Sequence, residues 1–153
     1  MSAVDARAAL TGGCQCGAVR FRLEAEPTGA SICHCRMCQK AGGGPFMAHA
    51  GVGLAELAWT KGAPKVFASS TIAERGFCGD CGTPLTYRVI GRDRISICLG
   101  ALDQPAAVAP EMQYGVESKL PWLDSIPSLP ERDIAAFLKG AAVVSRQHPD
   151  HEH

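Results

Sequence analysis

The amino-acid sequence predicts a mostly β domain made of small sheets, with a short helix near the C-terminus. Short segments of alternating apolar and polar residues recur along the chain, and 17 glycines and 10 prolines are spread between them. A helical spacing of apolar residues is clear only near the end of the chain. With 153 residues, 46% hydrophobic and 20% charged, the chain can bury a core of its own. We therefore expect one domain over residues 1–145 and a disordered polar tail over residues 146–153.

Five segments have the pattern of β-strands. The first, AVRFRLE (18–24), places Val19, Phe21 and Leu23 on one face and charged residues, including Arg20, on the other. Such alternation is typical of a strand with one buried face. The other four segments are FMAHAGV (46–52), KVFASS (65–70), PLTYRVI (84–90) and RISICLG (94–100), with a hairpin turn expected at IGRD (90–93).

The C-terminal helix is expected over PERDIAAFLKGAAVV (130–144). Ile134, Phe137 and Leu138 fall on one face of a helix in this segment, and Pro130 suits its start. This segment therefore predicts the helix of the domain.

Charge and hydropathy exclude two classes of partner. The formal net charge is zero and no run of Lys or Arg forms a basic stripe, so we expect no nucleic-acid binding. No segment reaches the roughly 18–20 apolar residues that cross a bilayer, so we expect no membrane insertion. The first residues have no apolar signal-peptide region and include Asp5 and Arg7. We expect a cytoplasmic protein, and a homo-oligomer is compatible with the sequence.

The eight cysteines indicate metal binding more than disulfides. Disulfides are rare in the reducing compartment expected here. Within Cys14-x-Cys16 and Cys33-x-Cys35, the two cysteines are too close to form a bridge without strain. Thiolates at such spacing can instead turn onto one zinc ion, about 2.3 Å from each sulfur.

Seven of the cysteines fall into groups that predict two different zinc sites. Cys33, Cys35 and Cys38 supply three ligands by themselves, and the two outer pairs together supply four. Four cysteines close a tetrahedron and make a structural site, whereas three leave a position for water or substrate. A glycine follows the last cysteine of each outer pair and supplies the bend. The predicted four-cysteine site contains Cys14, Cys16, Cys78 and Cys81.

Two other interpretations of the three-cysteine group stay open. A fourth protein ligand is available in His34, whose side chain points away from its neighbours in an extended segment, or in Cys98, which reads as a buried apolar residue. The group can also be a cluster of reactive or redox-active thiols. We nevertheless expect an open three-cysteine site.

Nearby charged residues suit a ligand with carboxylates. Three thiolates and one zinc ion sum to a charge of −1, which a low-dielectric site disfavours without a cation. Arg36 and Lys40 follow the cysteines closely and are the predicted substrate-binding residues, either offsetting this charge or binding carboxylates. His49 is interpreted as a strand histidine with its hydrogen bonds satisfied.

An ordered set of motifs resembles the glutathione-dependent formaldehyde-activating enzymes, a family that also includes relatives of centromere protein V. The matching motifs run from about residue 12 to residue 130. In order they are GGCQCGAVRF, CHCRMCQKAGGGPF, TKGAPKVFASS, RGFCGDCGTPL, CLGALD and VESKLPWLDSIPSLP. The resemblance implies several small coiled antiparallel sheets around structural zinc. It also implies two zinc ions, on the same two groups of cysteines as above.

The resemblance further implies a reaction between a thiol and an aldehyde. The expected activity is that of a carbon–sulfur lyase, which forms or cleaves an S-hydroxymethyl adduct of glutathione and formaldehyde or a related aldehyde. Cys33, Cys35 and Cys38 are the expected catalytic residues. The alternative is a zinc-stabilised module that binds or carries a thiol without turnover. The chain departs from the usual family residues at Gln39 (often Arg), Gly42 (often Ser or Thr) and Gln113 (often His).

Overall fold

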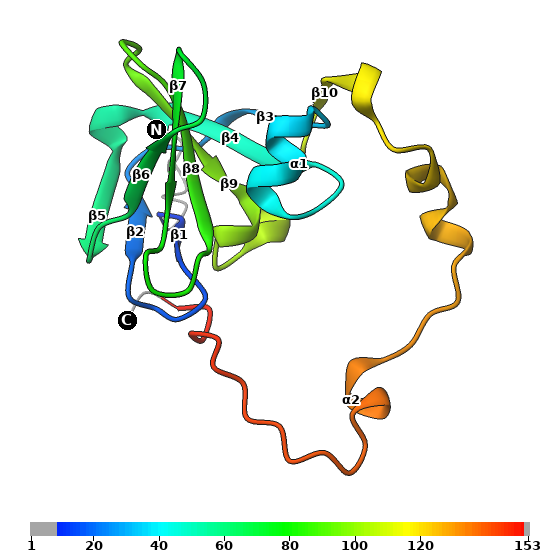
Figure 1. The fold of residues 1–153 in the computed structure, drawn as a ribbon. Coiled ribbons are helices and arrows are strands. Elements are labelled where there is room, and N and C mark those ends of the chain that lie inside the picture. Colours follow the sequence, from blue (N-terminus) through cyan, green and yellow to red (C-terminus); the bar gives the residue numbers. More distant parts are fainter. Residues whose placement is uncertain (1–8, 152–153) are drawn as a thin grey trace, which may run out of the picture.

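The computed structural model describes residues 9–151, in which ten strands form two sheets (Figure 1). The small sheet has the order β1-β2-β5, and the large one has the order β10-β3-β4-β9-β8-β7-β6. Among the described residues, every strand pair is antiparallel except β10 with β3, which is parallel. The strands are β1 (Thr11–Gly13), β2 (Arg20–Leu23), β3 (Thr28–Cys33), β4 (Met47–Gly53), β5 (Leu57–Lys61), β6 (Lys65–Ala68), β7 (Ala73–Phe77), β8 (Pro84–Val89), β9 (Arg94–Cys98) and β10 (Met112–Tyr114).

The mostly β prediction is confirmed, and all five predicted strands occur, as β2, β4, β6, β8 and β9. The other five strands were not predicted. β1 and β10 are three residues long, β3 and β7 are rich in glycine and polar residues, and β5 (LAWTK) has no alternation, so the pattern alone does not reveal them.

The core confirms the alternation expected in β2. Phe21 and Leu23 are each 1% exposed, and the Phe21 ring packs edge-on against Trp59 at a centroid distance of 5.9 Å. Arg20, however, was placed on the polar face and is only 4% exposed. Its guanidinium is buried because it forms an ion pair with Asp103, with an Nη1–Oδ1 distance of 2.9 Å.

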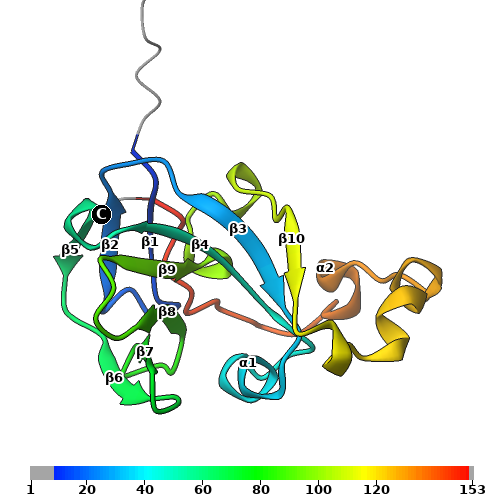
Figure 2. The same ribbon diagram turned by 90° about the horizontal axis from the view of Figure 1, so that it is seen from above.

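The one helix beside the cysteines was not predicted. Helix α1 (Arg36–Gly42) begins directly after β3 (Figure 2), and Gly43 ends it with a φ of 68°. At its start, the Cys35 sulfur accepts the backbone N–H of Cys38, as a capping side chain does. Short 3-10 turns occur at Leu54–Glu56, Leu99–Ala101, Pro105–Ala107, Val116–Ser118 and Pro121–Ser128.

The C-terminal helix is shorter than predicted. Helix α2 covers Ile134–Phe137 instead of residues 130–144. Ile134 is 67% exposed and Phe137 is 64% exposed, so the predicted apolar face packs against no core. Without such packing a short helix is marginal in water, and Gly140, at a φ of 84°, interrupts any continuation.

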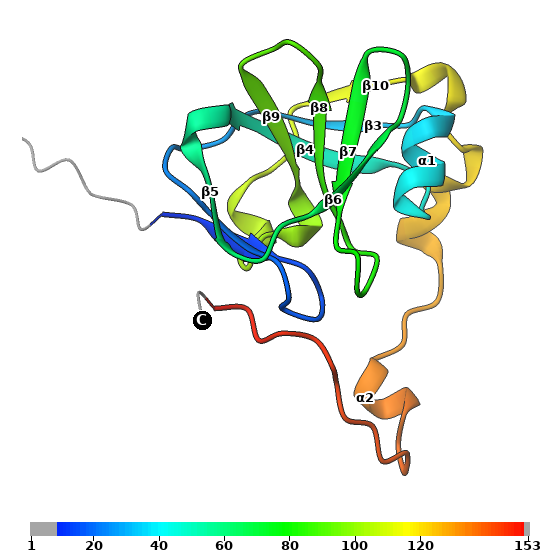
Figure 3. The same cartoon turned by 60° about the vertical axis from the view of Figure 1, so that its left-hand side comes forward.

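After β10 the chain runs outside the sheets, passes through α2 and returns to the end of the small sheet (Figures 1 and 3). There the backbone N–H of His148 donates to the carbonyl oxygen of Gln15 at 2.6 Å. The tail disorder, the single domain and the homo-oligomer stay predictions. Within residues 9–151, no helix combines the length and apolar character needed to span a bilayer.

Candidate metal centres and active-site cavity

The four outer cysteines gather as predicted. Cys14 and Cys16 lie in the turn after β1, and Cys78 and Cys81 lie in the turn between β7 and β8; their four sulfurs lie within 4.8 Å of one another. The Cys14–Cys16 and Cys16–Cys78 sulfur distances are 3.6 and 3.9 Å. Tetrahedral zinc with bonds of about 2.3 Å needs sulfurs about 3.8 Å apart, so the donors and their spacing fit zinc.

The two turns that hold these sulfurs share the same backbone features. The backbone N–H of Val19 donates to Cys14 Sγ at 3.2 Å, and that of Asp80 donates to Cys78 Sγ at 3.4 Å. The glycine after the second cysteine has a φ of 79° in the first turn and 80° in the second, where side chains other than glycine are strained. The predicted glycine bend and the backbone donors at sulfur are therefore present in both turns.

This group bridges the two sheets. The first turn belongs to the small sheet and the second to the large sheet. The backbone N–H of Gln15 also donates to Thr83 Oγ1 between the two turns, at 3.0 Å. A metal ion held by all four sulfurs would therefore tie the sheets together.

The three inner cysteines form a second group at the junction of β3 and α1. Cys33 ends β3, Cys35 caps α1, and Cys38 lies in the first turn of that helix; their sulfurs also lie within 4.8 Å of one another. Among the described residues, no fourth Cys, His, Asp or Glu joins this group. The structure contains three soft donors with the spacing of zinc ligands and no fourth from the chain.

The two proposed fourth ligands lie elsewhere. His34 is 2% exposed, and its Nε2 lies 2.9 Å from the side-chain oxygen of Gln113. Cys98 is 6% exposed in β9, and burial raises the pKa of its thiol to about 12. Neither residue joins the three sulfurs, although the buried His34 Nδ1 has no hydrogen-bond partner among the described residues.

A cavity of about 250 Å³ lies beside the three sulfurs. Cys33, Cys35 and Cys38 all line it, together with His49 and Arg75. The rest of its wall is rich in hydroxyl groups, from Ser31, Ser69, Ser70, Tyr87, Ser96 and Tyr114. The cavity therefore suits a small polar molecule that reaches the sulfurs.

Arg75 supplies the positive charge beside the sulfurs. It is 4% exposed, and its Nη2 donates to Cys38 Sγ at 3.3 Å. Its Nε donates to Ser69 Oγ at 2.8 Å, and the guanidinium carbon lies 4.9 Å from the centre of the Tyr87 ring. No carboxylate pairs with Arg75 among the described residues. A buried guanidinium needs a countercharge, and the three-cysteine group would provide one when it is deprotonated.

This finding changes the predicted origin of the compensating charge. Arg36 and Lys40 are both exposed, and neither lines the three-cysteine cavity. The Arg36 guanidinium donates to the side-chain oxygen of Gln39 at 2.5 Å instead. Arg75 was missed because it lies in β7, whose sequence AERGF has no strand alternation. Its position three residues before Cys78 gave no usable signal, because Cys78 belongs to the other cysteine group.

His49 is also part of this cavity. It is 8% exposed, and its Nε2 has no hydrogen-bond partner among the described residues, so the interpretation of a satisfied strand histidine is wrong for this atom. Burial, assisted by the positive charge of Arg75, lowers the pKa of His49 to about 4. The ring is therefore neutral near pH 7 and has a polar atom available to a ligand.

Most of the chain is similar to a known protein family. Residues 9–118, which include both cysteine groups, match the family of glutathione-dependent formaldehyde-activating enzymes. The chain belongs to this family.

Two relatives extend the comparison. An uncharacterized lyase of Schizosaccharomyces pombe is 36% identical over 76 residues, which are 50% of this chain and 55% of the relative. The chain thus spans about half the length of that curated relative. A crystal structure of a Rhodobacter sphaeroides protein superposes with a TM-score of 0.53 over 68% of this chain and 98% of that one. Its identity of 23% supports the fold alone.

Two departures from the usual family residues stabilise one end of the site. Gln39 donates from its side-chain nitrogen to the carbonyl oxygens of His34, at 2.7 Å, and Ser118, at 3.1 Å. Gln113 contacts the His34 ring, as described above. Both glutamines therefore hold the segment after β10 against the cysteine turn. Gly42, the third departure, leaves no room for a side chain, since a Cβ there would lie 2.7 Å from Met47 Cγ.

A glycine allows this segment to approach the site closely. Gly115 has a φ of 64°, and a Cβ on it would lie 2.7 Å from the backbone nitrogen of Cys35. The preceding residue, Tyr114, accepts the backbone N–H of His34 at 2.9 Å and lines the cavity. Tyr114 of β10 therefore forms part of the wall of the three-cysteine cavity, and Gly115 packs against Cys35 directly after it.

Proposed function

We propose that this protein is a zinc-dependent enzyme of the carbon–sulfur lyase type. Its substrates are a small thiol, glutathione in the first place, and formaldehyde or a related aldehyde, which it joins into or releases from an S-hydroxymethyl adduct. The observation that carries this proposal is the group of three sulfurs, with no fourth ligand from the described chain, that opens onto a cavity beside a buried arginine. The family and the relative named as a lyase support the reaction type.

Zinc is the proposed cofactor at both cysteine groups. Cys14, Cys16, Cys78 and Cys81 would hold one ion with a structural role, and Cys33, Cys35 and Cys38 would hold the other. Bound at the three-cysteine group, zinc supplies an open coordination position that favours a thiolate over a thiol and polarises a carbonyl. Since the chemistry needs reduced thiols, we expect the protein to act in the cytoplasm.

In this proposal, Arg75 offsets part of the negative charge at the three-cysteine group. Three thiolates with one zinc ion have a charge of −1, and a substrate thiolate would raise it to −2. Arg75 Nη2 already donates to Cys38 Sγ, so its charge offsets one unit inside the cavity. A cation in a buried site acts more strongly there than it would in water. Arg75 therefore makes the entry of an anionic sulfur less unfavourable.

The addition of a thiol to an aldehyde moves one proton and oxidises nothing. A carbon–sulfur bond forms, the carbonyl becomes a carbon–oxygen single bond, and the thiol proton ends on that oxygen. Neutral His49, with its unpartnered Nε2 in the cavity, is suited to hold this proton or to hydrogen-bond the oxygen. His49 is therefore the proposed acid–base residue.

Arg36 and Lys40 keep a role outside the cavity in this proposal. Both are exposed on α1, close to the cysteines in sequence. We expect them to bind the carboxylates of glutathione, because Arg75, which lines the three-cysteine cavity, already donates to Ser69 and Cys38.

The test is the rate of exchange between free and S-hydroxymethyl glutathione, measured by NMR with the zinc-loaded protein. We expect exchange faster than the spontaneous reaction, and we expect Cys38→Ala to abolish both this acceleration and glutathione binding while the protein keeps one zinc and its fold. Cys98→Ala is the matched control, because Cys98 is equally buried but lies outside both groups. It should retain the activity.

Two outcomes would contradict the proposal. Glutathione binding without any acceleration would instead indicate the thiol-carrying module. Unchanged binding in Cys38→Ala would remove the three-cysteine group from the site altogether.

A further inference from the structure

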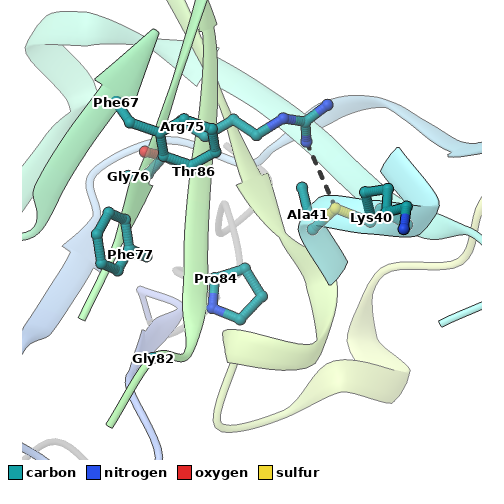
Figure 4. Close-up of a pocket in the computed structure, with 10 residues that line it drawn as sticks. Lys40, Ala41, Phe67, Arg75, Gly76, Phe77, Gly82, Pro84 and Thr86 are labelled. Carbon is teal, nitrogen blue, oxygen red and sulfur yellow. Dashed lines mark hydrogen bonds between the residues drawn. The ribbon is translucent and has the colours of Figure 1, made fainter. Parts of the chain in front are cut away.

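A second cavity, of about 350 Å³, shares a single residue with the three-cysteine cavity. Among the described residues that line the two cavities, only Arg75 belongs to both. The second cavity lies between α1 and the strands β6, β7 and β8 (Figure 4). None of the seven cysteines of the two groups lines it, and among its lining residues the proposed thiol reaction uses only Lys40 and Arg75.

One part of this cavity is apolar. The rings of Phe67 and Phe77 lie 6.0 Å apart in an edge-to-face arrangement, and Figure 4 shows Phe77 and Pro84 close to each other on this side of the cavity. Phe67 is 45% exposed, although it is a large apolar side chain. Aromatic rings with exposed surface in a cavity favour a ligand with an apolar, flat or branched body.

The other part contains two positive charges and no negative one. Lys40 and Arg75 line the cavity, and no Asp or Glu does. Neither cation forms an ion pair among the described residues. Figure 4 shows the Arg75 side chain extending from β7 toward α1, where Lys40 lies. This end of the cavity therefore favours an anion.

The hydrogen bonding of Arg75 supports the same conclusion. Its Nη1 donates to the sulfur of Met47 at 3.4 Å, the dashed line in Figure 4. A thioether sulfur is a weak acceptor, whereas Nε and Nη2 have a hydroxyl and a thiol sulfur. A carboxylate oxygen would be a much better partner for Nη1.

We propose that this second cavity binds a small monocarboxylate with an aromatic or branched apolar body. Lys40 and Arg75 Nη1 would bind the carboxylate, and Phe67, Phe77 and Pro84 would contact the body. Lys40 and Arg75 also have roles in the proposed reaction, but this site needs neither a thiol nor an aldehyde, so its ligand can be tested in the absence of both substrates.

The probe is 4-fluorophenylacetate, titrated against the zinc-loaded full chain and followed by 19F NMR. We expect saturable binding with a Kd on the order of 1 mM, typical of a weak small-molecule contact. The neutral 4-fluorophenylacetamide should bind about tenfold more weakly, because it lacks the charge. Lys40→Met should weaken the binding of the carboxylate about fivefold to tenfold, and Phe67→Ala should weaken both probes.

The matched control is Lys61→Met, which removes an exposed lysine from β5, outside the cavity. It should leave the Kd unchanged. Equal binding of acid and amide, equal effects of the two lysine variants, or the absence of saturable binding would each overturn the proposal. None of these outcomes touches the thiol reaction, which the glutathione exchange assay tests separately.

Discussion

The two cysteine groups contain the same ligand atoms in very different surroundings. The four-cysteine group joins two turns that lie in different sheets, and two of its members, Cys16 and Cys81, are exposed. The three-cysteine group comes from a single turn, borders a cavity and contacts the buried Arg75. Water can screen the charge of the first group, whereas the second group depends on a cation supplied by the protein.

This difference is the basis for proposing a structural role for the first group and a reactive role for the second. The first group offers sulfurs for all four positions of a tetrahedral ion, so a bound ion would have no position left for a ligand. The second group lacks a fourth residue and is surrounded by hydroxyl groups and an unpartnered histidine nitrogen. Removing a ligand should therefore affect stability at the first group and binding at the second.

The largest effect is expected from Cys81→Ala. Apparent binding free energies of structural zinc are about 10–16 kcal/mol, whereas whole domains are stable by only about 5–15 kcal/mol. The variant should lose the link between the two sheets and unfold. Circular dichroism during heating, together with the zinc content, checks this result. A folded variant with a cooperative transition would show that the four-cysteine group is not needed for the frame.

A second prediction asks how much of the frame depends on contacts other than metal. Asp103 accepts hydrogen bonds from Arg20 in β2 and from Thr11 in β1, so it binds the small sheet to the segment after β9. Asp103→Asn leaves the Arg20 guanidinium without its partner, and breaking a buried ion pair costs about 3–5 kcal/mol. Urea unfolding at pH 7 and constant zinc should show this loss. Glu24→Gln, in an exposed pair with Arg22, should change stability by less than about 1 kcal/mol.

The same pair predicts a pH dependence. Burial raises the pKa of Asp103, but the hydrogen bonds of Arg20 and Thr11 outweigh it and hold the pKa below its usual 3.8. A lowered pKa in the folded state means that the stabilisation is complete above the unfolded pKa and is lost as pH falls through the folded one. The difference between the wild type and Asp103→Asn should therefore shrink below about pH 4. A difference that stays constant to pH 3 would contradict the assignment.

The grouping of neighbouring cysteines was predictable because it depends on local spacing. Cysteines two or three residues apart can reach one ion whatever the rest of the chain does, and a following glycine provides the bend. The same holds for strands such as β2, whose alternation is visible in a few residues. These features need no knowledge of distant contacts.

The surroundings of the three-cysteine group were not predictable in this way. Arg75 and His49 come from β7 and β4 and reach the cysteines only through the strand order of the large sheet. The sequence pattern does not reveal the strand order of a sheet. It therefore predicted that the compensating positive charge comes from Arg36 and Lys40, which are close to the cysteines in sequence. The expected C-terminal helix occurs as α2, but it is shorter than residues 130–144 for a related reason, because its apolar face has no partner in the described structure.

Of the variants Cys81→Ala, Asp103→Asn and Arg75→Met, the last should have the smallest effect. It also compares the zinc affinities of the two cysteine groups most directly. Contacts outside the ligand set typically change metal affinity 10-fold to 100-fold, so the three-cysteine group should lose about this much affinity for zinc. The four-cysteine group, which Arg75 does not contact, should keep its zinc. Native mass spectrometry in the presence of a competing chelator counts the ions on each chain and separates the two sites.

Two matched variants decide whether charge is the cause. Arg75→Lys retains the positive charge but not the donors to Ser69 and Met47, so it should restore part of the zinc affinity if charge dominates. Arg88→Met removes a neighbouring arginine of the same sheet whose ion pair, with Glu74 at 3.6 Å, lies away from the cysteines, and it should leave both ions bound. If Arg75→Met kept two zinc ions as tightly as the wild type, the buried guanidinium would serve only to pack against Tyr87. The difference between the two cysteine groups would then rest on the missing fourth ligand alone.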